Sequence, residues 1–257
     1  MKKTIIVKIG TNILTTENGK CDLNNLRAII NQLAIIKKTY NIIIVTSGAI
    51  TCGSEELEIE AKTIPQKQAA ASVGQILLMK EYLQFFNHHN IRIAQVLLSK
   101  NSIKDAKNNE NIINTINTLL TENIIPIINE NDTTSTDEID ENFGDNDQLS
   151  VKVATLLDIH QLIILTDIDG LFDKNPKKHK DAKLISEVNA ITQDQINNIK
   201  DSKSKSSRGG MKSKLQAAKT ATENDIKVTI ANGRRDNIIL DIINNKFIGT
   251  TIKKESK

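Results

Sequence analysis

Aliphatic residues follow two alternating patterns along the chain. Short runs rich in Ile and Val are followed by longer stretches in which apolar residues recur with the spacing of one helix face. The short runs are typical of strands buried on both faces, and they lie at 4–9, 42–46, 91–98, 124–129, 162–166 and 227–231. Helices are predicted at 22–39, 66–88, 103–122, 147–158, 211–224 and 236–245. This alternation predicts a largely parallel sheet covered by helices on both faces.

The composition narrows the classes of function. Aliphatic residues are abundant, there is no Trp, and 34 basic residues nearly balance 31 acidic ones, so no general attraction to nucleic acid or to a membrane surface is expected. The apolar run near the N-terminus is interrupted by Lys8 and is too short for a signal peptide, which predicts a cytoplasmic protein. Cys21 and Cys52 lack the spacing of a metal site, and reduced thiols are expected.

Glycine and hydroxyl residues follow the first two predicted strands, where open α/β sheets bind their ligands. In Lys8-Ile9-Gly10-Thr11-Asn12, the glycine would let backbone N–H groups approach a phosphate, and Lys8 would supply positive charge. An ordinary turn with a solvated lysine explains this motif equally well. Ser47, after the second run, either caps a helix or binds an anion at its start.

The segment 129–147 contains eight acidic residues and neither Lys nor Arg. Asp132 and Asn146 have side chains suited to the ammonium group of an amino acid, and Asp147 could hold two lysines through charge-assisted hydrogen bonds. The alternatives are a solvated loop, a Ca²⁺ loop that lacks EF-hand spacing, and simple N-capping by Asn146 or Asp145.

Two later segments suit a nucleotide. Thr166 and Asp167 end the fifth predicted strand, where they could meet a nucleoside. Gly209 and Gly210 precede a predicted helix, so they could form a phosphate-binding nest from which Lys214 reaches a transferring phosphoryl group. The spacing is not that of a Walker A loop. The basic residues around it could instead form a solvated face or a nucleic-acid patch, although aromatic partners for bases are scarce.

Taken together, the ordered motifs KIGTN, VTSGAI, KQ…VGQ, NEND, GDND, LTDIDGLF and GGMKSK resemble the amino-acid kinase family, from Lys3 to about Thr250. NEND and GDND are similar to its glutamate-phosphorylating branch. The resemblance implies a three-layer α/β/α sandwich with a largely parallel central sheet. It also implies transfer of the γ-phosphoryl group of ATP to the side-chain carboxylate of L-glutamate, with Mg²⁺ carried by ATP and no metal bound by protein side chains alone.

The resemblance also assigns roles to residues. Lys8 would contact the ATP phosphates, Lys214 would stabilise the transferring phosphoryl group, and Asp147 would organise both lysines. The glutamate-binding positions would be Ser47, Asp132 and Asn146. The remaining ATP-binding positions would be Gly10, Thr11, Thr166, Asp167, Arg208, Gly209, Gly210, Met211, Lys212 and Ser213. Arg208 and Ser213 stand where the family usually has Thr, and this departure concerns the detail of the ATP loop.

The resemblance further implies a single kinase domain over 1–257, with the amino-acid side in about 1–150 and the ATP side in about 151–257. Many relatives carry a C-terminal PUA domain, which is not expected here. A homo-oligomer, a dimer or tetramer, and feedback inhibition by L-proline are expected from the family. The competing functions keep the fold with another acceptor (acetylglutamate, carbamate, aspartate or a nucleoside monophosphate), or make the chain an amino-acid sensor or a nucleic-acid binder.

Overall fold

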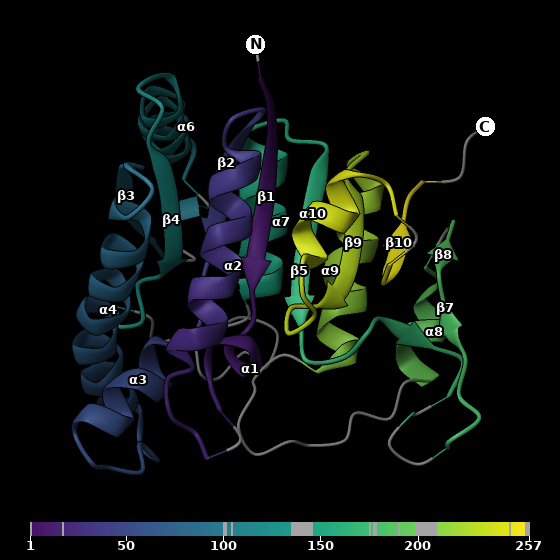
Figure 1. Cartoon of the computed structure of the whole chain (residues 1–257), viewed down its shortest axis with the longest axis horizontal. Coiled ribbons are helices and arrows are strands. Elements are labelled where there is room, and N and C mark those ends of the chain that lie inside the picture. The colour runs from purple at the N-terminus through teal and green to yellow at the C-terminus, as the bar shows by residue number, and fades with distance from the viewer. Residues whose placement is uncertain are drawn as a thin grey trace.

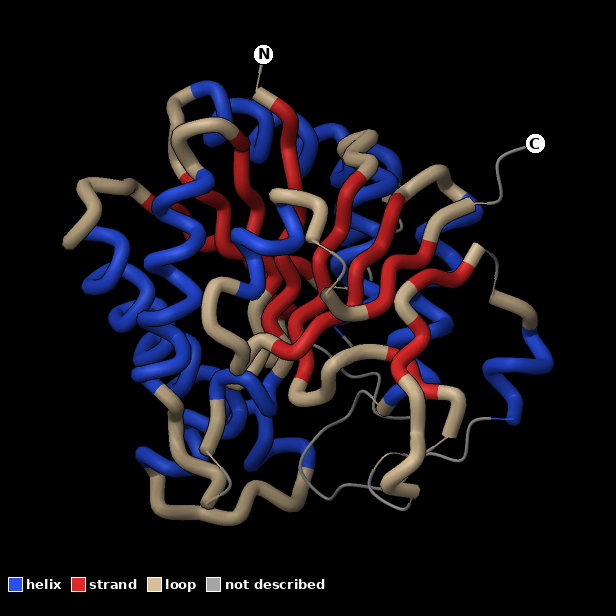
Figure 2. The backbone as a smooth tube through the Cα atoms, turned by 45° about the vertical axis from the view of Figure 1, so that its right-hand side comes forward, coloured by secondary structure: helices blue, strands red, loops and turns tan. Residues whose placement is uncertain are grey.

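A computed structural model describes residues 2–16, 18–99, 102–103, 105–134, 146–174, 176, 179–189, 191–198, 210–246 and 248–254. Its centre is an eight-stranded sheet with the order β3-β4-β2-β1-β5-β9-β10-β8. Six neighbouring strands are parallel: β3 (Ile93–Leu98), β4 (Ile125–Glu130), β2 (Tyr40–Val45), β1 (Lys3–Ile9), β5 (Gln161–Thr166) and β9 (Lys227–Asn232). These are the six strands that the aliphatic runs predicted, and the prediction of a largely parallel sheet is confirmed by their pairing. Figure 2 shows the strands of the sheet in red with helices packed around them.

Alternate residues of the central strands face two separate hydrophobic cores. In β1, Ile5 and Val7 contact one core while Ile6 contacts the other, and all three are fully buried. Burial on both faces explains why these strands have no polar alternation, and each buried aliphatic side chain contributes about 1.5–3 kcal/mol. The two cores define the two helical layers of the sandwich.

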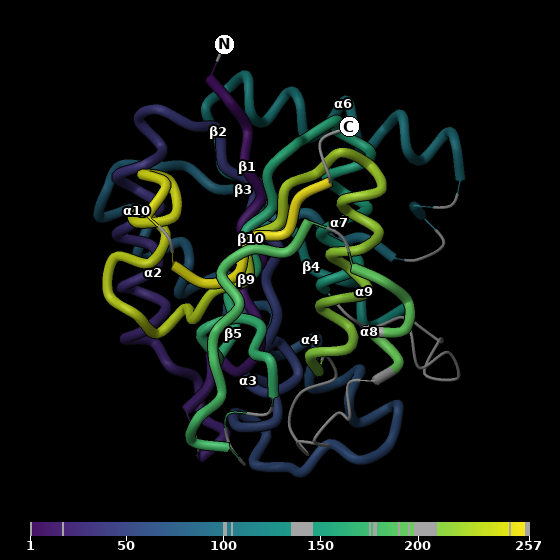
Figure 3. The backbone as a smooth tube through the Cα atoms, turned by 90° about the vertical axis from the view of Figure 1, so that its right-hand side faces the viewer, coloured from purple at the N-terminus to yellow at the C-terminus, as the bar shows by residue number. Residues whose placement is uncertain are grey.

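The first core is covered by α2 (Leu23–Ile36), α4 (Ile64–Asn87) and α10 (Ile238–Ile243). The second is covered by α6 (Ala106–Thr121), α7 (Asn146–Leu156), α8 (Gln193–Asn198) and α9 (Met211–Glu223). Figure 3 shows α2 and α10 on one side of the sheet and α7 and α9 on the other. The predicted three-layer sandwich is therefore confirmed. Within the described residues, no helix has the length and apolar character needed to cross a membrane.

Several short elements lie outside the predicted ranges. They are the helices α1 (Thr11–Leu14), α3 (Ala49–Glu56) and α8, the two-residue strands β6 (Leu171–Phe172), β7 (Leu184–Ile185) and β8 (Glu187–Val188), and β10 (Thr250–Ile252). A helix start after Ser47 was expected, and α3 begins there, at Ala49. β10 pairs antiparallel with β9, which extends the sheet beyond its parallel part. The arrowheads of β1 and β5 point to the lower edge in Figure 1, where α1 and α3 lie. That edge is the carboxyl end of the parallel strands.

Helices α3 and α4 cross at unusually close range because glycine stands on both sides of the contact. A Cβ atom at Gly53 would overlap the carbonyl of Ala70, and a Cβ atom at Gly74 would overlap the carbonyl of Ala49. No other residue would allow the two backbones to approach so closely. The crossing fixes α4 against the helix that begins directly after β2.

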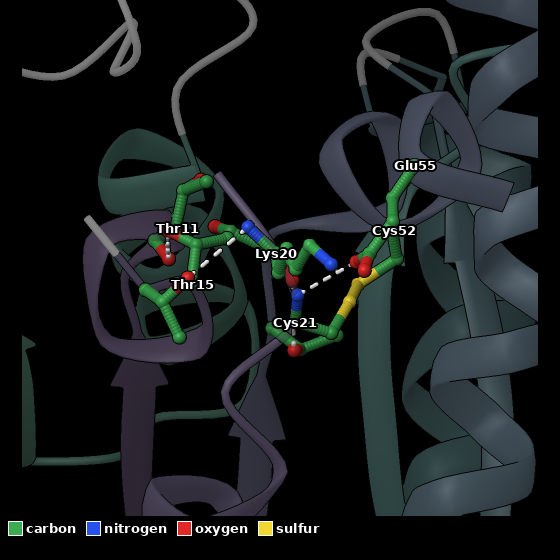
Figure 4. Close-up of a disulfide and its surroundings, with 9 residues drawn as sticks. Thr11, Thr15, Lys20, Cys21, Cys52 and Glu55 are labelled. Carbon is green, nitrogen blue, oxygen red and sulfur yellow. Dashed lines mark hydrogen bonds between the residues drawn. A yellow bond between two sulfur atoms is a disulfide. The ribbon is translucent and has the colours of Figure 1, made fainter. Parts of the chain in front are cut away.

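The expectation of reduced thiols was wrong, because Cys21 and Cys52 form a disulfide with a Cα–Cα distance of 5.7 Å. The backbone of Cys21 pairs with that of Thr15, just after α1, in an isolated antiparallel β-bridge, and Cys52 lies in α3 (Figure 4). The Cys21 N–H also donates to Glu55 Oε2 at 2.9 Å. No sequence pattern indicates this proximity, since the two cysteines are 31 residues apart and meet only through the packing of α3 beside α1.

Reducing this disulfide is expected to lower the free energy of unfolding by about 3–4 kcal/mol, because a cross-link of this span restricts the unfolded chain. Urea unfolding with and without dithiothreitol measures the effect. The Cys52→Ser variant is the control, since dithiothreitol should leave its unfolding midpoint unchanged. An oxidised wild-type chain that unfolds at the same urea concentration as the reduced chain would contradict the prediction.

Candidate active site

Two lysines and one aspartate meet at the carboxyl edge of the sheet. Lys8 lies near the end of the central strand β1, Asp147 is the second residue of α7, and Lys214 lies in the first turn of α9. Lys8 Nζ is 2.5 Å from Asp147 Oδ1, and Lys214 Nζ is 3.0 Å from Asp147 Oδ2. Each oxygen of one carboxylate thus pairs with a different ammonium group. We call these three residues the lysine–aspartate centre.

The lysine–aspartate centre is almost completely buried. Asp147 is 0% exposed, Lys8 4% and Lys214 6%. Burial alone would raise the pKa of the Asp147 carboxyl, but the positive charges of Lys8 and Lys214 outweigh it and lower the pKa to about 2. The aspartate is therefore ionised at neutral pH. Two ammonium groups and one carboxylate leave one net positive charge at this point, which suits an anion.

Glycine begins the helices next to this centre. Gly10 is the N-cap of α1 and Gly210 is the N-cap of α9, and neither supplies a side-chain hydrogen bond to its helix. By contrast, α2, α4 and α6 are capped by the side chains of Asp22, Thr63 and Asp105. A helix start without a side-chain cap leaves N–H groups that can bind phosphate oxygens.

The absence of a side chain at Gly10 also keeps space beside the lysine. A Cβ atom there would lie 3.7 Å from Lys8 Nζ and 3.1 Å from the carbonyl oxygen of Leu165. A larger residue would therefore crowd the region around the ammonium group. With the uncapped helix starts, this space fits the phosphate groups of a nucleotide.

The other residues predicted to bind ATP lie around the same edge. Thr11 is the first residue of α1, and the Thr166 hydroxyl, at the end of β5, donates to Asp167 Oδ1 at 3.2 Å. Asn12 Nδ2 donates to Asp167 Oδ2 at 3.1 Å and so joins α1 to the end of β5. Met211, Lys212 and Ser213 form the start of α9, whereas Arg208 and Gly209 lie outside the described residues.

The residues predicted to bind the amino acid gather at the ends of β2 and β4. Asn146 Nδ2 donates to the Thr46 carbonyl at 2.5 Å, to Ser47 Oγ at 3.0 Å and to Asn129 Oδ1 at 2.9 Å. Asp132 is half-buried in the turn after β4. Ser47 and Asn146 are thus in direct contact, and Asn146 directly precedes Asp147 in the chain.

The capping interpretations of Ser47 and Asn146 were wrong. The N-cap of α3 is Gly48, with φ of 94°, and no side chain caps the helix. The left-handed conformation explains why glycine is needed there. Asn146 is the first residue of α7, and its amide donates to groups of β2 and β4 instead of accepting from its own helix. Both side chains are therefore directed to the edge of the sheet.

Sequence reasoning assigned no individual role to four further polar residues in this region. Asn129 Nδ2 donates to Gln75 Oε1 at 2.8 Å, and the hydroxyls of Thr46 and Tyr82 are 2.9 Å apart. Burial raises the pKa of the Tyr82 phenol, so it stays protonated at neutral pH. Tyr82 was interpreted only as part of a long helix, and Gln75, although part of the VGQ motif of the family resemblance, was assigned no role of its own. Their polar groups inside a buried face were the available signal, because a buried polar group is normally hydrogen-bonded.

The sequence matches the profile described as the amino acid kinase family over residues 3–232. The chain belongs to the amino acid kinase family. The match to this family includes Lys8, Asp147 and Lys214, so the whole lysine–aspartate centre lies within it.

Curated members of the family resemble the chain over most of its length. Glutamate 5-kinase from Clostridium perfringens is 44% identical, with 96% of this chain and 94% of the relative covered. Glutamate 5-kinase from Ligilactobacillus salivarius is 40% identical, with 98% and 97% covered. The enzyme of that name from Thermoanaerobacter sp. is 42% identical, with 96% of this chain and 67% of the relative covered.

Solved structures of other proteins have the same fold. UMP kinase from Ureaplasma parvum has a TM-score of 0.65 at 19% identity, covering 99% of this chain and all of that one. UMP kinase from Bacillus anthracis has a TM-score of 0.67 at 17% identity, with 99% and 97% covered. At such low identity the likeness concerns the fold alone, so the choice of acceptor must come from residues of the site.

Proposed function

We propose that this chain is a glutamate 5-kinase, which transfers the γ-phosphoryl group of ATP to the γ-carboxylate of L-glutamate. The product is L-glutamyl 5-phosphate, and the reaction is the first step of proline biosynthesis. The observation that carries the proposal is the lysine–aspartate centre, in which the Asp147 carboxylate pairs with two buried lysines beside uncapped helix starts. Relatives with that name support the choice of acceptor, at 40–44% identity over nearly the whole chain.

The chemistry requires alignment and charge neutralisation more than proton transfer. The acceptor carboxylate is already ionised at neutral pH, so no general base is needed. One of its oxygens forms a bond to the γ-phosphorus while the bond from that phosphorus to the β,γ-bridging oxygen breaks, and ADP leaves. Lys8 and Lys214 are proposed to offset the negative charges that would otherwise repel the two reactants. Asp147 fixes the positions of both ammonium groups.

The binding roles are distributed over the edge of the sheet. Gly10, Thr11, Thr166, Asp167 and the segment 208–214 are proposed to bind ATP, and Ser47, Asp132 and Asn146 to bind L-glutamate. Mg²⁺ is proposed to arrive with ATP and to neutralise part of the phosphate charge. No group of three or more His, Cys, Asp or Glu side chains able to hold a metal occurs in the described part of the chain.

The proposal also covers the division of the domain, its location in the cell, its oligomeric state and its regulation. We place the amino-acid side in residues 1–150 and the ATP side in 151–257 of one kinase domain, acting in the cytoplasm. The family resemblance supports a homo-oligomer and inhibition by L-proline. The near balance of 34 basic and 31 acidic residues argues against binding to nucleic acid or to a membrane surface.

The test is formation of an acyl phosphate that depends on ATP and Mg²⁺, trapped with hydroxylamine as a hydroxamate. L-glutamate is compared with N-acetyl-L-glutamate, L-aspartate and bicarbonate plus ammonia. A hydroxamate signal confined to L-glutamate is expected. Signal with a different acceptor would overturn the substrate assignment, and absence of signal with every acceptor would overturn the kinase proposal in favour of a sensing protein.

A further inference from the structure

Three side-chain amides form a continuous chain across the end of the sheet. Gln75 of α4 accepts from Asn129 at the end of β4, at 2.8 Å, and Asn129 accepts from Asn146 of α7, at 2.9 Å. Helices α4 and α7 belong to opposite layers of the sandwich. The amide chain therefore connects the two layers at the place where the amino acid is proposed to bind.

Two backbone groups fix the direction of every amide in this chain. The Thr46 carbonyl accepts from Asn146, so the Asn146 NH₂ group must face the sheet. The Glu130 N–H donates to Asn129 Oδ1 at 2.9 Å, so the Asn129 oxygen must face that backbone. Asn129 then has only its NH₂ group left for α4. An acceptor is required there, and Gln75 Oε1 provides it.

The direction of these amide hydrogen bonds determines which atom of Asn146 is left to bind a ligand. Asn146 uses its NH₂ group on Thr46, Ser47 and Asn129, and its Oδ1 atom is buried with no hydrogen-bond partner among the described residues. An unpaired buried acceptor is unfavourable by about 1–3 kcal/mol unless a ligand supplies a donor. The α-ammonium group of an amino acid is a strong donor of the matching kind.

Gln75 itself is held in place by the helix crossing. It follows Gly74, whose close contact with α3 prevents α4 from shifting, and it is only 8% exposed. Its Nε2 atom has no hydrogen-bond partner in the described part of the chain. The hydrogen bond that Gln75 does make is the one its Oε1 atom accepts from Asn129. Because buried polar groups are normally hydrogen-bonded, this pairing indicates that Gln75 orients Asn129 and does not merely fill space.

We infer that Gln75 is a positioning residue for the amino-acid substrate: through Asn129 it orients the Asn146 amide so that Asn146 Oδ1 accepts from the substrate α-ammonium group. This inference rests on the proposed function, because it takes L-glutamate as the substrate. It adds a residue of α4 that does not need to touch the ligand. Loss of the Gln75 acceptor leaves the buried Asn129 NH₂ group unpaired, so the Glu130 N–H alone holds the Asn129 amide against Asn146, and the preference of Asn146 for a donor weakens.

The Gln75→Met variant tests this, because Met fills a similar volume without an acceptor. The KM for L-glutamate is expected to rise about tenfold or more, as for loss of a hydrogen bond to a charged group, with the KM for ATP and kcat within about twofold of wild type. Gln75→Glu keeps an acceptor and the shape of the side chain, and it should recover most of the lost affinity for L-glutamate. If Gln75→Met does not fold, Gln75→Asn withdraws the acceptor by one methylene group and carries the same expectation.

Gln32→Met is the matched control. Gln32 is 6% exposed, and its Oε1 accepts from the Ile239 N–H at 2.8 Å in the contact between α2 and α10. This variant should lose thermal stability without a change in the KM for L-glutamate. An unchanged KM in Gln75→Met, an equal rise in both KM values, or no recovery in Gln75→Glu would overturn the inference. A wild-type chain that forms no γ-glutamyl hydroxamate would instead overturn the proposed function, so the two failures are distinct.

Discussion

The Asp147→Asn variant is expected to lose at least about 10³-fold in kcat and about 3–5 kcal/mol in the free energy of unfolding. Asp147 is 0% exposed and is the counter-ion of both Lys8 and Lys214. Replacing one partner of a buried ion pair leaves uncompensated charge in a medium of low polarity, which is strongly destabilising. The catalytic loss follows because the two ammonium groups repel each other and leave their positions. The hydroxamate assay and urea unfolding measure the two effects.

The same variant has a distinct pH signature. The folded-state pKa of Asp147 is about 2, below the ordinary value of 3.8, so the ion pairs stabilise the fold fully above about pH 4. This contribution, about 2–3 kcal/mol, is lost as the pH falls through about 2. The Asn variant should lack this part of the acid sensitivity between pH 4 and pH 2.

Asp158→Asn is the matched control for Asp147→Asn. The side chain of Asp158 is 92% exposed and lies just after α7, and its φ of 54° is a conformation that Asn adopts readily. Its activity and stability should remain close to those of wild type. Wild-type turnover in Asp147→Asn would rule out the role proposed for the lysine–aspartate centre.

The fold could be predicted from the sequence wherever an element was long enough to show its pattern. Five of the six parallel strands are largely buried on both faces, so their Ile and Val runs stand out from the helices between them, whereas β3, at the edge of the sheet, was found from its aliphatic run although only Leu98 in it is buried. Elements such as β6, with two residues, or α1, with four, are shorter than one repeat of any pattern. Their structure depends on contacts from distant parts of the chain. The donation from the Leu171 N–H to Thr250 Oγ1, at 2.7 Å, is such a contact beside β6.

The candidate site was predictable where residues follow strand ends. Lys8 and Thr166 lie at the ends of their strands and Ser47 follows its strand, and parallel strands bring their carboxyl ends to one edge. Gln75 could not be found in this way, since it lies in the middle of α4 and reaches the site only because α4 crosses α3 at glycine. The disulfide between Cys21 and Cys52 likewise depends on tertiary packing, in this case of α3 beside α1. The pattern of residues along the chain therefore did not predict the features that depend on tertiary contacts between helices.

The Lys214→Ala variant is expected to reduce kcat by about 10³-fold while the KM for L-glutamate stays within about twofold. Lys214 is 6% exposed, and its ammonium group is 3.0 Å from Asp147 Oδ2 at the uncapped start of α9. Charge placed where a phosphoryl group transfers stabilises the transition state, and removing one such group typically reduces turnover by orders of magnitude. The proposed glutamate-binding residues Ser47 and Asn146 contact each other. Initial rates over a range of L-glutamate concentrations at saturating ATP separate the two parameters.

Lys219→Ala is the matched control for Lys214→Ala because it removes a lysine from the same helix outside the proposed site. Lys219 lies in α9, where its Nζ is 3.7 Å from Glu223 Oε1 and the side chain is 28% exposed. Its turnover should match wild type, since a single ion pair of this kind contributes little to stability and nothing to the site. A rise in the KM for L-glutamate without a fall in kcat in Lys214→Ala would show that Lys214 binds L-glutamate and does not act on the transferring phosphoryl group. A wild-type kcat in Lys214→Ala would show that Lys214 has no part in phosphoryl transfer. Lys8 would then be the one buried cation of the lysine–aspartate centre that acts on the phosphoryl group.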